Sequence, residues 1–191
     1  MRKINNKGFT MIELLAAMVV LGLIFGIAVP AISNTMSKTK NKTYVSDALK
    51  LISNAEYQMR KDNTIPKPTK NRCILMSLVY LNNGVFDEAP NGGEYIRNKS
   101  FVVLVNNNST NETEYYVRLM EDMGDSEYKG INFNTKDQLN EENAYNYVTN
   151  LSGSELYPIT GSSNSVVLNK VKAKIPQCTS VFVYAPDSGD A

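Results

Sequence analysis

The chain has 191 residues, enough for one soluble domain with a membrane anchor but too few for two full domains beside a membrane span. Its 20 basic and 19 acidic residues give a net charge of +1, which is no overall signal for nucleic-acid binding. It contains no His, the usual general base of Ser and Cys hydrolases and the commonest transition-metal ligand, so we expect no enzyme, no cofactor and no metal site.

Charge is unevenly distributed along the chain. Residues 33–70 hold eight basic and three acidic side chains, whereas residues 84–160 hold thirteen acidic and five basic ones. We therefore expect the outer half of the protein to be acidic.

A long apolar run follows Glu13. The nineteen residues from Leu14 to Ile32 include no polar side chain. At a rise of about 1.5 Å per residue they make a helix of roughly 28 Å, close to the hydrocarbon thickness of about 30 Å. A secretory signal peptide is the alternative, but its apolar core usually runs about 7–15 residues and ends at a small-residue cleavage site, which the following SNTMSKTKNKTY does not offer. The run therefore predicts a membrane-spanning helix.

The residues around the start of this run resemble the N-terminus of type IV prepilins and their relatives. The resemblance rests on KGFTMIELL, with Gly8 before Phe9 and Glu13 four positions further on, and on Pro30 inside the apolar run. In that family a membrane peptidase cuts after the glycine on the cytoplasmic side and methylates the new N-terminal amine. The resemblance covers about residues 7–33 and implies cleavage between Gly8 and Phe9, with methylation of Phe9.

The resemblance also implies a role for the acidic residue. After cleavage the amine of Phe9 is a cation, and Glu13 of a neighbouring subunit can approach it once both leave the lipid for a packed core of helices. A carboxylate alone in a membrane costs several kcal/mol, whereas a paired one sets the axial register. The alternative is that Glu13 only extends to the lipid headgroups near the helix end.

Three further residues in the run are candidate assembly residues. Gly22 and Gly26 form a G-x-x-x-G pair, a spacing that permits close helix packing and is also common by chance. Pro30 removes one helical hydrogen bond and kinks or loosens the turn before it. The family pattern suggests local melting there on assembly, and a passive kink is the alternative.

The helical pattern continues beyond the apolar run. Apolar residues recur at spacings of three and four from Val45 to Met59, which predicts an amphipathic helix up to about Asp62 that packs on a sheet. Pro66 and Pro68 then end the helix. The next apolar segment, CILMSLVYLNNGVF, indicates a short helix or apolar turn. It resembles the segment that links helix and sheet in many Gram-positive pilins, which implies a Gram-positive source.

Two pairs of strands are predicted after this segment. FVVLV (101–105) and EYYVRLM (114–120) flank an Asn-rich loop and should form a hairpin, and SVVLNKVKAKI (165–175) and SVFVYA (180–185) should form a second pair. Residues 121–164 are polar and show only a helical tendency in KDQLNEENAYNYV. The expected fold class is α+β, the type IV pilin fold, with a long N-terminal helix packed on an antiparallel sheet of about four strands.

The predicted organisation has four parts. These are a leader peptide (1–8), a transmembrane and polymerisation helix (9–33), an amphipathic continuation of that helix (34–62) and a globular pilin head (63–191). No internal repeat or low-complexity linker divides the head.

The two cysteines are Cys73 and Cys178. They lie 105 positions apart and outside any CxxC spacing, which excludes zinc-finger and thioredoxin-like sites. If the head faces an oxidising exterior they can form a disulfide, and the alternative is two buried reduced thiols.

Two other patterns were weighed as ligand sites. EDMGDSE (121–127) places four carboxylates around a glycine, which could hold Ca²⁺ but lacks the EF-hand spacing, so a solvated acidic loop is favoured. Tyrosines near basic residues, such as Tyr44 with Lys42, could stack on single-stranded DNA, but scattered tyrosines in a β-rich domain favour packing roles.

The resemblance implies a structural subunit of a type IV pilus, processed by prepilin peptidase and polymerised through its N-terminal helix into a surface fibre for adhesion, motility or aggregation. The expected partners are other pilin subunits, in a homopolymer or with minor pilins, the prepilin peptidase, the inner-membrane assembly platform and, before assembly, membrane lipid. Nucleic acid is not expected. The chain should be a single-pass protein of the cell membrane before assembly and extracellular in the pilus afterwards.

Two alternatives remain open at this point. One is a pseudopilin of a type II secretion or DNA-uptake machine, which shares the same signal. The other is a membrane-anchored ligand-binding module that never polymerises, and retention of monomers after crosslinking in intact cells would favour it.

Overall fold

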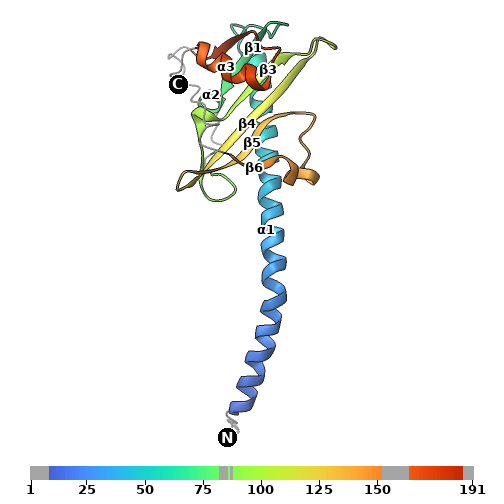
Figure 1. The fold of residues 1–191 in the computed structure, drawn as a ribbon, viewed down its shortest axis with the longest axis vertical. Coiled ribbons are helices and arrows are strands. Elements are labelled where there is room, and N and C mark those ends of the chain that lie inside the picture. Colours follow the sequence, from blue (N-terminus) through green and yellow to red (C-terminus); the bar gives the residue numbers. More distant parts are fainter. Residues whose placement is uncertain (1–8, 82–85, 87, 152–163, 187–191) are drawn as a thin grey trace, which may run out of the picture. The chain divides into compact units, whose positions relative to one another are not determined.

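A computed structural model describes residues 9–81, 86, 88–151 and 164–186. The chain divides into two compact units, Met1–Thr39, which we call the N-terminal unit, and Lys40–Ala191, which we call the head. The long helix α1 (Met11–Lys61) contributes residues to both units (Figure 1).

The head is built around one sheet, and α1 is followed along the chain by short helices and strands. They are β1 (Arg72–Ser77), α2 (Leu78–Leu81), β2 (Glu94–Tyr95), the 3-10 helix η1 (Arg97–Lys99), β3 (Phe101–Asn106), β4 (Thr113–Gly124), β5 (Glu127–Thr135), the 3-10 helix η2 (Glu141–Asn146), β6 (Val148–Leu151), α3 (Asn164–Lys174) and β7 (Ser180–Tyr184).

Among the described residues seven strands form this sheet, in the order β6-β5-β4-β3-β1-β7, with β2 paired to β4 outside that path. The pairs are antiparallel except for β1 and β7, which run parallel. A long N-terminal helix followed by an antiparallel-rich sheet confirms the predicted α+β class and fits the type IV pilin fold. The predicted hairpin is also confirmed, since β3 and β4 pair from Phe101–Arg118 to Asn106–Thr113.

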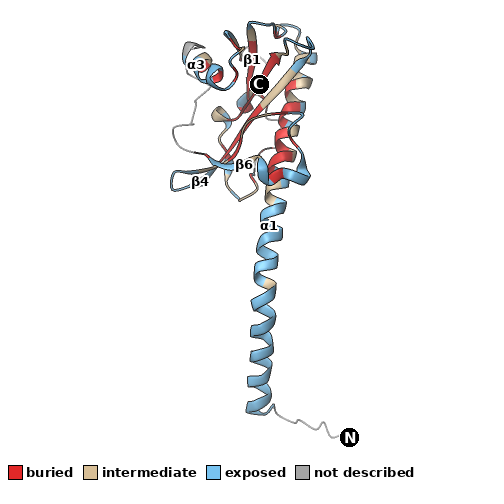
Figure 2. Cartoon of the chain, turned by 45° about the vertical axis from the view of Figure 1, so that its right-hand side comes forward, coloured by how far each residue is buried: buried red, intermediate tan, exposed pale blue. Residues whose placement is uncertain are grey.

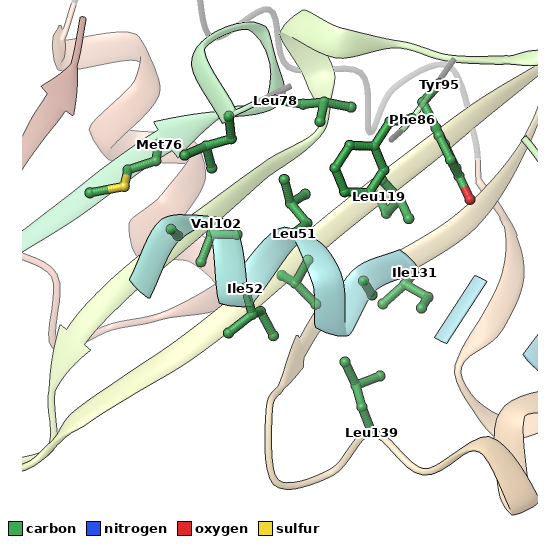
Figure 3. Packing of buried hydrophobic residues seen from close by; sticks show 14 of the residues in the cluster. Leu51, Ile52, Met76, Leu78, Phe86, Tyr95, Val102, Leu119, Ile131 and Leu139 are labelled. Carbon is green, nitrogen blue, oxygen red and sulfur yellow. The ribbon is translucent and has the colours of Figure 1, made fainter. Parts of the chain in front are cut away.

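The main core lies between α1 and one face of the sheet. The buried side chains of α1 begin at Tyr44 and end at Ala55, at the spacings of three and four that the sequence showed. Figure 2 shows these buried residues confined to the part of α1 that lies in the head. Figure 3 shows Leu51 and Ile52 among apolar side chains of the sheet, including Leu119. The predicted amphipathic helix is thus confirmed, and it ends at Lys61.

A second, smaller core lies on the other face of the sheet. Successive side chains of β1 alternate between the two cores, with Ile74 and Met76 in the main core and Cys73 and Leu75 in the second one. The second core also contains three buried residues of the α3 segment, which are Val167, Val171 and Ile175. Helices therefore cover both faces of the sheet at β1.

Three expectations about the sheet were wrong. Residues 165–175 were predicted as a strand, but they form most of α3, because their buried apolar residues recur every four positions. Consequently β7 pairs with β1 rather than with that segment. Residues 72–77 form a strand instead of the predicted helix or turn, which is limited to α2. The sheet exceeds four strands because residues 121–164 contain β5 and β6.

Candidate processing and assembly site

The predicted cleavage junction lies at the edge of the described residues. Gly8 and the leader peptide 1–8 fall outside them, while Phe9 is described and its side chain is 85% exposed. The helix α1 begins at Met11, two residues after Phe9. The residue predicted to become the N-terminus therefore precedes the first helical turn and is accessible.

Thr10 and Glu13 form a capping box at the start of α1. The Glu13 Oε2 atom accepts hydrogen bonds from the Thr10 backbone N–H at 2.8 Å and from the Thr10 Oγ1 hydroxyl at 2.7 Å. In return, the Glu13 backbone N–H donates to Thr10 Oγ1 at 3.4 Å. This is the reciprocal pattern of Thr-x-x-Glu, which satisfies two helix N–H groups that would otherwise lack partners. T-x-x-E is a readable sequence signal for this cap, although the cap was not among the predicted features.

The capping box leaves Glu13 able to bind a further donor. Both hydrogen bonds from Thr10 go to the same oxygen, Oε2, and an ionised carboxylate offers about four acceptor positions on its two oxygens. The side chain is exposed in the isolated chain. The amine of another chain's Phe9 could therefore be added without first breaking the cap.

The apolar run is fully available for contact with lipid or with other helices. From Leu14 to Ile32 every side chain except half-buried Ala28 is exposed (Figure 2). Within the described residues α1 is the one helix long and apolar enough to cross a membrane, by length and composition. So large an exposed apolar surface is unfavourable in water, which fits membrane anchoring of the chain.

The structure places the other three assembly candidates on this exposed helix. A Cβ atom built on Gly22 or Gly26 would meet nothing within 4 Å among the described residues, so both backbones are open to close approach. The helix continues through Pro30 without interruption, and residues on both sides of it are helical. The roles of Gly22, Gly26 and Pro30 in assembly therefore remain predictions.

A buried carboxylate cluster in the head was missed by the sequence analysis. Glu121 on β4 is 0% exposed, and it accepts the hydroxyl hydrogen of Tyr44 from α1. It also accepts the backbone N–H of Asn91 at 3.1 Å, the Asn91 side-chain amide at 3.1 Å and the backbone N–H of Gly93 at 3.1 Å. These hydrogen bonds replace the water that the Glu121 side chain loses on burial. This cluster joins the helix, the sheet and the 91–93 loop.

Gly93 is required by the close approach of this loop to β4. A Cβ atom at that position would lie 2.3 Å from the backbone oxygen of Asp122 and 3.0 Å from Oε1 of Glu121. Any side chain would push the loop away and break the hydrogen bond from Gly93 N–H to Glu121.

A second carboxylate of α1 is held in the same region. Asp47 is 5% exposed, accepts the hydroxyl hydrogen of Tyr95 at 2.9 Å and forms an ion pair with Lys50 at 2.9 Å. Burial, followed by the hydrogen bond to Glu121 and its charge, raises the pKa of Tyr44 far above its usual value. Burial and the charge of Asp47 do the same to the pKa of Tyr95. Both hydroxyls therefore remain protonated donors over the whole physiological pH range.

These positions bear on the two ligand patterns described from the sequence. Glu121 points into the protein, whereas Asp122, Asp125 and Glu127 are exposed, so the four carboxylates of EDMGDSE do not converge. The described residues hold no group of three or more His, Cys, Asp or Glu that could bind a metal. Tyr44 is 0% exposed and cannot stack on a base.

Cys73 and Cys178 form a disulfide in the structure, with their Cα atoms 5.6 Å apart. It joins β1 to the turn between α3 and β7, next to the parallel pairing of β1 with β7. Both cysteines are buried in the second core.

We expect non-reducing peptide mapping of the mature protein to yield a linked peptide containing Cys73 and Cys178. Closing a loop of about a hundred residues restricts the unfolded chain, and removal of such a bridge typically costs about 2–4 kcal/mol. Cys73→Ser/Cys178→Ser should therefore unfold at a lower denaturant concentration than the parent chain. Two peptides alkylated without reductant would contradict the bridge.

Comparison with known proteins identified one family. Residues 3–29 match the family described as the prokaryotic N-terminal methylation motif. The match spans most of the leader, Phe9, the Thr10–Glu13 capping box and most of the apolar run. No curated protein and no solved structure matched the chain. The chain thus carries a prepilin-like N-terminal signal of the class that prepilin peptidase processes.

Proposed function

We propose that this chain is a structural subunit of a type IV pilus. One observation carries the proposal: the methylation motif at residues 3–29 leads directly into an apolar helix whose side chains no other described residue covers. A helix that spans the membrane before assembly and packs among like helices afterwards uses the same surface in both states. The fibre would serve adhesion, motility or aggregation outside the cell.

The proposal assigns partners by the same reasoning. The prepilin peptidase would cut after Gly8, membrane lipid would cover the helix of the monomer, and the inner-membrane platform would deliver it to other pilin subunits. No catalytic role is proposed, because the chain has no His and no recognisable nucleophile motif. A pseudopilin of a secretion or DNA-uptake machine would carry the same signal, and the two differ in whether long filaments reach the cell surface.

The test of this proposal is the composition of filaments sheared from the surface of cells that make the chain. A pilus subunit should be present in them in its cleaved form, and a major subunit should dominate them. The proposal would be contradicted if the cleaved chain stayed in the membrane fraction while the sheared filaments consisted of other proteins. That result would favour the pseudopilin or the anchored binding module, and crosslinking in intact cells separates those two.

Mass spectrometry of the mature chain should show Phe9 at the N-terminus with one added methyl group. Gly8→Val should leave the full-length precursor in the membrane, because the peptidase can no longer fit the residue before the cleaved bond. A matched control is Gly22→Val, which changes a glycine inside α1 without touching the junction and should be cleaved normally. Assembled chain that begins at Met1 or Arg2 would contradict the processing.

A further inference from the structure

The face of α1 that points away from the sheet carries only positive charge in the head. Its exposed residues are Lys42, Thr43, Lys50, Ser53, Tyr57, Arg60 and Lys61, which we call the basic stripe. At about 100° per residue they fall within an arc of about 100°, opposite the buried face of the helix, and they extend over about 28 Å. A groove of about 390 Å³, lined in part by Lys50 and Ser53, lies along the stripe.

The two carboxylates on this part of α1 offset only one member of the stripe, Lys50. Asp47 is turned inward, where it binds Tyr95 and the ammonium group of Lys50. Glu56 is bound to Lys136, which belongs to the turn after β5. In the middle of the stripe the side chain of Tyr57 is 54% exposed. The stripe therefore presents basic groups around one exposed aromatic ring.

A surface of opposite sign lies at one end of the sheet. We call it the acidic edge, and it consists of Glu94, Asp122, Asp125 and Glu127, all exposed. Glu94 and Asp122 are direct cross-strand partners of β2 and β4, an arrangement in which like charges repel. None of the four forms an ion pair within the part of the chain that the structure describes. Met123, 42% exposed, lies among them.

We propose that the basic stripe of one copy docks on the acidic edge of a second copy. Each surface combines an exposed aromatic or apolar side chain with an excess of one charge, since the acidic edge has four carboxylates beside one lysine, Lys129, and the excess charges are opposite. The turn between β4 and β5 points away from α1 in both Figure 1 and Figure 2, so one head does not join its own two surfaces. Two different surfaces that fit each other on separate copies make a head-to-tail contact, which propagates into an open assembly.

The inference rests on the proposed function and names the contact between heads that would accompany packing of the N-terminal helices. Individual exposed ion pairs contribute little, about 0–1 kcal/mol each. Like charges forced together at an interface cost much more, so charge reversal is a stronger test than charge removal.

The experiment uses charge reversal and its compensation in cells whose sole copy is the variant. Lys42→Glu/Arg60→Glu should lower the yield of sheared filaments at least about tenfold, and Glu94→Lys/Glu127→Lys should do the same. Combining all four should restore the yield to within about threefold of the parent. Lys50, Asp122 and Asp125 are left unchanged, because Lys50 binds Asp47, Asp122 accepts the N–H of Gly124, and Asp125 has a positive φ of 51°.

The matched control reverses two exposed lysines of α3, Lys172→Glu/Lys174→Glu. This control changes the net charge as much as Lys42→Glu/Arg60→Glu, should leave filament yield near the parent value and should not rescue Glu94→Lys/Glu127→Lys. An immunoblot for cleaved subunit in the membrane checks that each variant folds and is processed.

Normal filaments from either reversed pair would overturn the contact while leaving the proposed function intact. Loss without rescue in the combined variant would also overturn it and would assign the stripe to another acidic partner, such as an anionic lipid surface. If the parent chain itself yields no filaments, the proposed function fails.

Discussion

Cells whose only copy of this chain carries Glu13→Ala are expected to accumulate cleaved subunit in the membrane and to release almost no filaments. The bond after Gly8 is unchanged, so cleavage should persist, and removal of a charge should let the helix insert at least as well as before. An incoming subunit would, however, bury the amine of Phe9 without a partner. Breaking a buried pair costs about 3–5 kcal/mol, which corresponds to a hundredfold or greater loss in affinity.

The capping box requires a control that separates two roles of the same carboxylate. Thr10→Ala removes the donor hydroxyl and the cap, worth about 1 kcal/mol, but keeps Glu13 for a neighbouring amine. We expect Thr10→Ala to reduce filament yield far less than Glu13→Ala. The measurement is an immunoblot of cleaved subunit in membranes together with the filaments sheared from cells. Equal losses in both variants would assign Glu13 to capping alone, and normal filaments from Glu13→Ala would refute the pairing.

The second large effect is a loss of stability of the head. Glu121→Ala should lower the free energy of unfolding by about 4 kcal/mol or more, because four donor groups of the cluster then lose Glu121 as an acceptor in a buried site. These groups are the Tyr44 hydroxyl, both donors of Asn91 and the backbone N–H of Gly93. The measurement is denaturant unfolding of the full chain in detergent micelles, followed by near-UV circular dichroism of the tyrosines.

Two variants calibrate this result. Glu127→Ala removes an exposed carboxylate from the neighbouring strand β5 and should change stability by no more than about 0.5 kcal/mol. Tyr44→Phe keeps the ring in the core but removes one donor, and should cost about 1–2 kcal/mol. If Glu121→Ala unfolds at the same denaturant concentration as Glu127→Ala, the cluster does not fasten the helix to the sheet.

The N-terminal features could be predicted because they are local in the sequence. Gly8, Phe9, Glu13 and the apolar run lie within one short segment, and the helix that follows shows its buried face through its own spacing. The Thr10–Glu13 cap was equally local, so its omission was a failure to read a visible signal. Local patterns need no knowledge of the rest of the fold.

Residues 165–175 were wrongly predicted as a strand because they fit both the period of two of a strand and the spacing of four of a helix. In VKAKI (171–175) apolar and basic residues alternate as in a strand, yet Val171 and Ile175 are also one helical step of four apart. Val167, another four positions back, would have favoured the helix, as would the lysines and Ala173. The secondary structure of such a short amphipathic segment depends on the surface that it covers, which here is the second core.

The error at β1 has a different cause. Its residues are buried on both faces of the sheet, so Cys73 to Ser77 show no alternation between apolar and polar side chains. The Glu121 cluster was equally hidden, because Tyr44 lies 77 positions and Asn91 lies 30 positions from Glu121. These groups meet only because the helix packs on the sheet, and no spacing in the sequence predicts that contact.

The position of β1 between β3 and β7 sets the order in which the two edges of β1 can be covered as the chain folds. Ile74 pairs with Leu104 on one side and with Phe182 on the other, so the second edge of β1 stays open until the later strand arrives. An open apolar strand edge is a place where chains pair wrongly with one another. The bond between Cys73 and Cys178 closes beside that pairing, so it ties the turn before β7 to β1. The disulfide therefore holds the later strand on the edge of β1 that would otherwise be open to another chain.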